Sequence, residues 1–234
     1  MNGIIKRKKS IVISCDCSYE RYHEILKQTE DLDVVGGYKL GFMLGLSMGL
    51  HKVVEFTRKY FTDKPLIYDG QKAGTDIPYT GRSFAKTLKN AGIDAVILFP
   101  LSGPETERAY IEAAFEEDLG VIVGGLMTHQ KYIRSQGGFI ADESVLEMYG
   151  IAADIGVKNF VVPANKIDEI KSIKRFLESR VKEPIFYSPG FSLKETKLSE
   201  VSSIFNGGFH PIIGRDIHQA KDIKKVILEY SNQI

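Results

Sequence analysis

Residues 95–125 read AVILFPLSGPETERAYIEAAFEEDLGVIVGG, and this stretch contains the unit that repeats along the whole chain. Two runs rich in Val and Ile, at 95–100 and 120–125, flank an amphipathic segment at 105–118. A short, continuously apolar run is typical of a strand buried on both faces, as in a parallel sheet. Because parallel neighbours need a crossover connection, this stretch predicts a strand–helix–strand unit.

The same alternation continues on both sides of this unit. Further apolar runs stand at 11–15, 34–41, 65–69, 159–163, 184–188 and 211–214, and helical patterns at 19–29, 51–61, 80–91, 144–155, 166–180, 198–205 and 216–230. Eight strand-and-helix pairs predict one α/β domain, residues 1–234, folded as a compact (β/α)8 TIM barrel. A doubly wound open sheet would show the same alternation, but the turn at 14–18 lacks a glycine-rich dinucleotide fingerprint.

The composition limits the classes of partner. The chain carries 31 Lys and Arg against 30 Asp and Glu, a net charge of +1, so no global field attracts nucleic acid or an anionic membrane. No apolar run approaches the roughly 18–20 residues of a membrane span. Cys15 and Cys17 are spaced too closely for an easy disulfide and form no zinc site by themselves. We therefore expect a cytoplasmic protein without nucleic-acid or membrane partners.

Charged residues gather where the first three predicted strands end. In a TIM barrel the chemistry lies at the carboxyl ends of the strands. Asp16 follows the first strand, Lys39 lies in the second, and the third leads into Asp69, Lys72 and Asp76. A lysine inside an apolar strand is costly unless a carboxylate pairs with it. We interpret Lys39, Asp69, Lys72 and Asp76 as an array of alternating charge. The alternative is a set of ordinary ion pairs at the barrel mouth.

The end of the eighth strand has the features of a phosphate site. Gly214 and Arg215 precede a predicted helix, so free backbone N–H groups and a guanidinium are expected to face the same point. The loops after strands seven and eight often bind phosphate in barrels. The alternative is a glycine turn beside a surface arginine.

Taken in order, these residues resemble the orotidine 5′-monophosphate decarboxylase family, especially its shorter archaeal and bacterial forms. The resemblance covers nearly the whole chain and rests on Asp16, Lys39, Asp69, Lys72, Asp76-Ile77, Thr80, Met127-Thr128-His129, Pro189-Gly190 and Gly214-Arg215. Two departures stand out. The family signature Asp-x-Lys-x-x-Asp has one extra residue on each side of Lys72, which Gly70 and Gly74 could absorb as a bulge. Lys194 stands where the family has a phosphate-binding glutamine.

The resemblance implies a decarboxylase that converts orotidine 5′-monophosphate (OMP) to UMP and CO2 in de novo pyrimidine biosynthesis, without a cofactor or metal. It implies catalytic roles for Lys72, Asp69, Asp76 and Lys39, with Lys72 stabilising and protonating a carbanion at C6. It implies substrate binding by Asp16, Lys39, Thr80, Thr128, Pro189, Gly190, Lys194, Gly214 and Arg215. It also implies a homodimer in which Asp76 enters the partner's site.

Two alternatives remain open on the sequence. Phosphosugar decarboxylases and aldolases of the same suprafamily share the barrel and the signature but use Mg²⁺, and they place a glutamate where Lys39 stands, since Mg²⁺ takes oxygen ligands. A catalytically impaired regulatory descendant would keep the nucleotide and phosphate contacts while the stretched signature misplaces Lys72.

Overall fold

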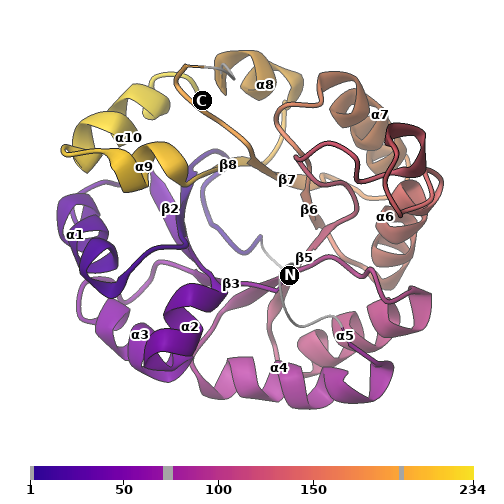
Figure 1. The fold of residues 1–234 in the computed structure, drawn as a ribbon, viewed down its shortest axis with the longest axis horizontal. Helices are drawn as coiled ribbons and strands as arrows, with labels where there is room; N and C mark the ends of the chain where they lie inside the picture. The colour runs from indigo at the N-terminus through magenta and orange to yellow at the C-terminus, as the bar shows by residue number, and fades with distance from the viewer. Residues whose placement is uncertain (1–2, 71–75, 195–197) are drawn as a thin grey trace.

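Eight parallel strands form a closed barrel inside a ring of helices (Figure 1). The computed structural model describes residues 3–70, 76–194 and 198–234. Each strand pairs in parallel with the next, and β8 returns to β1. The strands are β1 Ile11–Cys15, β2 Val35–Leu40, β3 Leu66–Asp69, β4 Ala95–Leu98, β5 Gly120–Gly124, β6 Asn159–Val161, β7 Ile185–Pro189 and β8 Phe209–Ile213. The predicted TIM barrel is confirmed.

The helices follow the strands in the predicted order, with two differences among the α-helices and two additional short 3-10 helices, η1 and η2. They are α1 Tyr19–Thr29, α2 Phe42–Met48, α3 Leu50–Arg58, η1 Pro78–Thr80, α4 Gly81–Asn90, α5 Pro104–Glu116, η2 Arg134–Gln136, α6 Ser144–Ile155, α7 Ile167–Glu178, α8 Leu198–Ile204, α9 Arg215–Gln219 and α10 Ile223–Ser231. The short helix α2 was not predicted, because only Leu44 of its residues is buried and its pattern is weak. The single helix predicted at 216–230 is wrong, because Ala220 is extended and Asp222 caps a new helix, α10.

The apolar side chains form two cores. One lies inside the barrel and contains alternate residues of the strands, among them Val12, Ile67, Ile97 and Ile212. The other lies between the strands and the helices and is larger. The N-terminal segment lies inside the ring of helices in Figure 1, and its Ile5 belongs to the interior core. Because this segment packs at the amino ends of the strands, the carboxyl ends remain open for a site.

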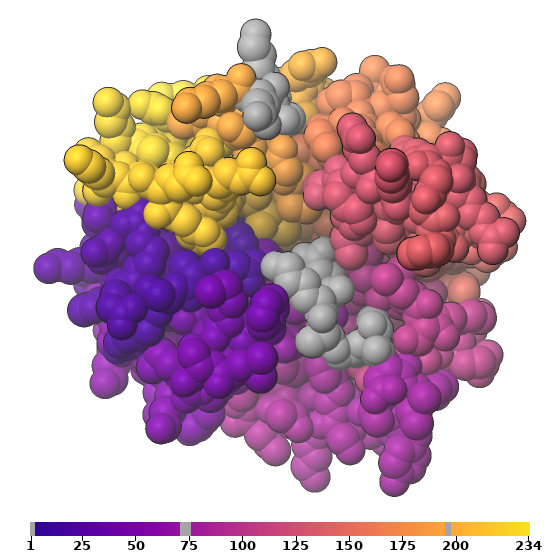
Figure 2. Space-filling view, viewed as in Figure 1, coloured from indigo at the N-terminus to yellow at the C-terminus, as the bar shows by residue number. Residues whose placement is uncertain are grey.

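The surfaces of the first and last parts of the chain lie side by side, indigo beside yellow in Figure 2. The pairing of β8 with β1 closes the barrel between them. The backbone N–H of Ile223, where α10 begins, donates to the Gln28 side chain of α1 at 2.8 Å. Of the helices in the described part of the chain, none is long and apolar enough to cross a bilayer.

Candidate active site

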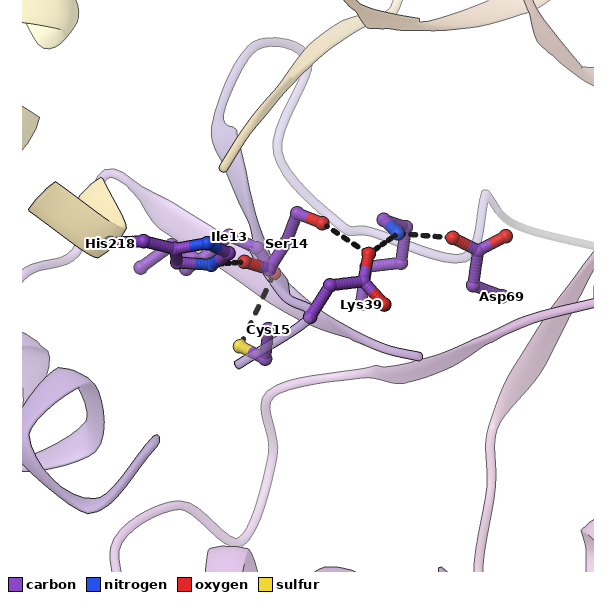
Figure 3. A network of polar contacts seen from close by, with 7 residues as sticks. Ile13, Ser14, Cys15, Lys39, Asp69 and His218 are labelled. Carbon is purple, nitrogen blue, oxygen red and sulfur yellow. Dashed lines mark hydrogen bonds and ion pairs between the residues drawn. The ribbon is translucent and has the colours of Figure 1, made fainter. Parts of the chain in front are cut away.

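Lys39 lies between two carboxylates at the open end of the barrel (Figure 3). Its Nζ donates to Oδ2 of Asp16 at 3.0 Å and forms a second, shorter ion pair with Oδ2 of Asp69. Asp16 follows β1, Lys39 is the penultimate residue of β2, and Asp69 ends β3. Because β1, β2 and β3 are neighbours in the barrel, their parallel pairing brings these three strand ends together.

Burial makes this pairing necessary. Lys39 is 3% exposed and Asp69 is 0% exposed. Burial alone lowers the pKa of Lys39, but the charges of Asp69 and Asp16 and their hydrogen bonds outweigh it, so the pKa lies above the ordinary value of a lysine. The ammonium therefore stays charged at neutral pH and presents a fixed positive charge between two acidic groups.

The position of Asp16 is set by its neighbours. Ser14 Oγ donates to Oδ2 of Asp16 at 3.2 Å, and the Ser14 carbonyl contacts Nε2 of His218 at 2.6 Å. A Cβ built on Gly41 would lie 1.5 Å from Oδ1 of Asp16. The carboxylate can therefore lie against the start of α2 only because residue 41 has no side chain.

A cavity of about 710 Å³ lies over this network, within the size range of small-molecule sites. Lys39 and Asp16 line one part of it, and Gly214 and Arg215 line another. Seven of the sequence-predicted site residues line the cavity: Asp16, Lys39, Thr128, Pro189, Gly190, Gly214 and Arg215. The cavity therefore combines a charge network with a separate cationic group.

The part of the cavity lined by Arg215 suits an anion. Arg215 is the first residue of α9, its side chain is exposed, and a guanidinium can bind a phosphate through two parallel hydrogen bonds. Gly190 lines the same cavity with φ of 104°, a conformation that favours glycine. Ser192, two residues further on, also lines the cavity.

The described lining of the cavity lacks four predicted site residues: Asp69, Asp76, Thr80 and Lys194. Asp69 is joined to the lining through its ion pair with Lys39. Asp76 is exposed, and its carboxylate accepts from the N–H of Ile77 at 2.8 Å. The Thr80 hydroxyl lies 2.7 Å from the Tyr110 hydroxyl. Lys194 is exposed, and its backbone N–H donates to Oγ of Ser192. Lys72 and the predicted bulge around it lie outside the described residues.

Sequence reasoning missed two polar residues of the cavity lining that support predicted ones: Ser14, which donates to Asp16 as described above, and Asn165. Asn165 Nδ2 donates to the carbonyl of Thr128 at 2.9 Å and thus joins the loop after β6 to the loop after β5. Asn165 stands close behind a strand end, the same positional signal that pointed to Asp16. His129, identified as part of the Met-Thr-His segment, also lines the cavity.

Solved structures of similar fold place this architecture among known proteins. The structure of orotidine 5′-monophosphate decarboxylase from Methanocaldococcus jannaschii, complexed with the inhibitor BMP, superposes with a TM-score of 0.81. The superposition covers 97% of this chain and 99% of that one, at 23% sequence identity. At this identity the likeness concerns the fold.

Sequence comparison identifies the family. The orotidine 5′-phosphate decarboxylase of Methanosarcina mazei is 30% identical over 234 residues, covering 98% of this chain and 97% of that protein. The orotidine 5′-phosphate decarboxylase of Methanosphaera stadtmanae is 28% identical over 229 residues, covering 97% and 98%. The model of the Orotidine 5'-phosphate decarboxylase / HUMPS family matches residues 10–230. The chain belongs to this family.

Proposed function

We propose that this chain is an orotidine 5′-monophosphate decarboxylase that converts OMP to UMP and CO2. The observation that carries the proposal is the buried Lys39 held between Asp16 and Asp69 at the edge of a cavity that also contains Arg215. The family membership and the full-length relatives of this name support the same activity. The free thiols of Cys15 and Cys17 fit the cytoplasm, where this pathway would operate.

The chemistry requires electrostatic stabilisation. Loss of CO2 from OMP leaves an electron pair at C6 of the pyrimidine, and a cationic group beside C6 stabilises it in the transition state. We assign this role and the following proton transfer to Lys72. Asp69 is assigned a place beside the substrate carboxylate. Lys39 fixes the orientation of Asp69 and Asp16 through the ion pairs described above.

The remaining residues are assigned to the ribose, the pyrimidine and the phosphate of the substrate. Asp16 and Thr80 bind ribose hydroxyls, and Thr128 contacts the pyrimidine. Gly214, Arg215 and Lys194 bind the phosphate, with Pro189 and Gly190 forming the wall. Arg215 is supported by its place in the cavity, whereas Lys194 rests on its sequence position alone.

Turnover without metal tests the proposal. Purified protein treated with EDTA is mixed with OMP, and the loss of ultraviolet absorbance is followed. We expect turnover by the wild type and none by Lys72→Ala, with unchanged circular dichroism. If Lys72→Ala retains activity within tenfold, Lys72 is not the proton donor. Tight binding of UMP without turnover by the wild type would favour the regulatory alternative.

The phosphosugar alternative makes the opposite prediction for metal. Those enzymes need an oxygen ligand for Mg²⁺ where this chain has Lys39, and an ammonium held there repels a divalent cation. Activity that is lost with EDTA and restored by Mg²⁺ would favour this alternative.

The phosphate assignment is tested by a pair of variants. Arg215→Ala is expected to raise KM for OMP at least tenfold, because one charged hydrogen bond to phosphate is worth about 1.5–3 kcal/mol. Lys194→Ala tests the second cation assigned to the phosphate, and it is expected to raise KM less than Arg215→Ala, because the Lys194 side chain is exposed and absent from the described cavity lining. An unchanged KM for Lys194→Ala would remove Lys194 from the phosphate site, and an unchanged KM for Arg215→Ala would remove Arg215.

The proposal includes a homodimer in which Asp76 completes the partner's site. Two observations support it: Asp76 is absent from the described lining of its own chain's cavity, and the neighbouring Ile77 and Tyr79 are 58% and 87% exposed. Co-expression of Lys72→Ala with Asp76→Ala tests the arrangement. Each variant alone is expected to be inactive, while mixed dimers keep one intact site, so about a quarter of wild-type activity returns under random pairing. No recovery would contradict a shared site.

A further inference from the structure

A single carboxylate oxygen joins the C-terminal helix to the segment that follows β7. Asp216 is the second residue of α9, directly after Arg215, and its Oδ2 accepts from the Tyr230 hydroxyl of α10 at 2.6 Å. The same Oδ2 accepts from the backbone N–H of Leu193 at 2.8 Å. The break between α9 and α10 makes this possible, because a continuous helix would keep residues 216 and 230 far apart.

The Tyr230 side of this contact is fixed. Tyr230 is 1% exposed. Burial raises the pKa of its phenol, and the bond to Asp216 raises it further, so the hydroxyl remains a donor over the whole working range of pH. A buried donor of this kind needs an acceptor, and Asp216 supplies it.

The Leu193 side of the contact reaches the cavity. Leu193 follows Phe191, which is 6% exposed, and Ser192, which lines the cavity together with Arg215. The hydrogen bond to Leu193 therefore holds the backbone beside Ser192 at a fixed distance from the start of α9.

We propose that Asp216 is a positioning residue for the phosphate end of the site. It acts through two neighbours: it ties the segment 191–193 to α9, so that Ser192 and Arg215 face the same part of the cavity. This inference rests on the proposed function, since the ligand is the phosphate of a nucleotide. It requires no contact between Asp216 and the substrate.

The test compares a ligand with a phosphate and one without it. Binding of UMP and of uridine is measured by calorimetry, and OMP turnover by absorbance, for Asp216→Ala, Asp216→Asn and Tyr230→Phe. We expect Asp216→Ala to raise KM for OMP and Kd for UMP about tenfold, the effect of about 1.4 kcal/mol of lost orientation. Its kcat stays within threefold and its Kd for uridine within twofold.

The conservative variants separate geometry from charge. The amide oxygen of Asp216→Asn can accept the same two hydrogen bonds, so this variant is expected to stay within about threefold of the wild type for UMP. Tyr230→Phe keeps the bond to Leu193 and is expected to show an intermediate effect. Asp222→Ala is the matched control: it removes the cap that accepts from the Lys225 N–H at 2.9 Å and loosens the same helix without touching Leu193.

Distinct results overturn the two proposals. If the wild type neither binds UMP nor consumes OMP, the proposed function fails and this inference fails with it. If the wild type is active and Asp216→Ala binds UMP as tightly as the wild type, the positioning role alone is wrong. Equal weakening for UMP and uridine, or a loss equal to that of Asp222→Ala, would mean general loosening and would also overturn it.

Discussion

A buried charge in the barrel is stable only together with its partners. Lys39 and Asp69 are almost fully buried, and removing one member of such a pair costs about 3–5 kcal/mol because the other charge is left behind. Asp16, the third member, is more exposed. Ser14 donates a hydrogen bond to its carboxylate, which lies in the space left by the missing side chain of Gly41. The arrangement therefore depends on a residue without a side chain as much as on the charged ones.

Gly41→Ala tests this dependence. The new Cβ would meet Oδ1 of Asp16 at 1.5 Å, so the carboxylate must move away from Lys39. We expect a loss of about 1–3 kcal/mol in the free energy of unfolding and a higher KM for OMP. Urea denaturation and steady-state kinetics measure the two effects.

Gly45→Ala is the control for this variant. It lies in α2, the helix that Gly41 caps, and its Cβ would meet no closer atom than one of Leu50 at 4.0 Å. Replacing a helical glycine by alanine is expected to stabilise the protein by up to about 1 kcal/mol. Equal stability of both variants would contradict the close approach of Asp16 to Gly41.

The sequence allowed us to predict site residues that stand at the end of a strand. It did not reveal residues whose hydrogen-bond partners are distant in the sequence. Lys39 could be predicted because a lysine in an apolar strand has few explanations. The roles of Asn165 and Asp216 could not, since their partners Thr128 and Leu193 are 37 and 23 positions away and meet them only in the folded barrel. Both partners contribute backbone groups, which every residue type carries apart from the missing N–H of proline, so the residue type of the partner gives no sign of the bond.

At the scale of elements, buried strands and amphipathic helices were predictable and short exposed helices were not. All eight strands stand where the apolar runs predicted them, with ends that differ by at most two residues. Helix α2 was not predicted, because Leu44 is its only buried residue. The break at Ala220 was also missed, because residues on both sides of it keep apolar side chains at helical spacing.

Asp94 shows how elements are joined at the amino end of the barrel. Its Oδ2 accepts from the backbone N–H of Leu66, which begins β3, at 2.7 Å and from Arg58, which ends α3, at 2.6 Å. Asp94→Ala is expected to lower the free energy of unfolding by about 1–2 kcal/mol in urea titrations. Asp31→Ala removes only the exposed ion pair to Lys224 and is expected to cost less than about 1 kcal/mol. Equal losses would mean that the bond to Leu66 contributes nothing.

At the scale of the whole molecule, the free energy of unfolding depends on pH through two buried groups, and their effects have opposite signs. Burial raises the pKa of Glu107 in α5 from 4.5 to about 8, and burial lowers the pKa of His210 in β8 from 6.5 to about 4. Each shift contributes about 1.4 kcal/mol per pH unit within its own window. The two contributions oppose each other between about pH 4.5 and 6.5, and only that of Glu107 acts above this range.

The variant Glu107→Gln tests the loss of stability that Glu107 causes as the pH rises. Glu107 is 2% exposed, and within the described residues its Oε1 has no hydrogen-bond partner. Above pH 4.5 the unfolded chain releases this proton while the folded chain keeps it, so the wild type loses stability as pH rises to about 8. The stability of Glu107→Gln relative to the wild type is expected to increase over this window, by up to about 5 kcal/mol. Glu105→Gln is the control: Glu105 is exposed, stands two residues before Glu107 in the first turn of α5, and its variant is expected to follow the wild type in urea titrations.

His210 causes a loss of stability as the pH falls, because the folded protein lowers its pKa instead of raising it. His210 is 1% exposed, its ring lies 4.9 Å from the ring of Tyr187 at a tilt of 44°, and its Nδ1 lies 2.9 Å from Oγ of Ser10. Burial outweighs the contact with Ser10 and keeps the ring neutral in the folded protein. Below pH 6.5 the unfolded chain binds a proton that the folded chain refuses until about pH 4, and stability is lost as pH falls through this window. His210→Gln is expected to gain stability relative to the wild type by up to about 3 kcal/mol between pH 6.5 and 4, whatever its stability at pH 7. A constant difference between the two urea midpoints across this range would show that His210 is protonated equally in both states.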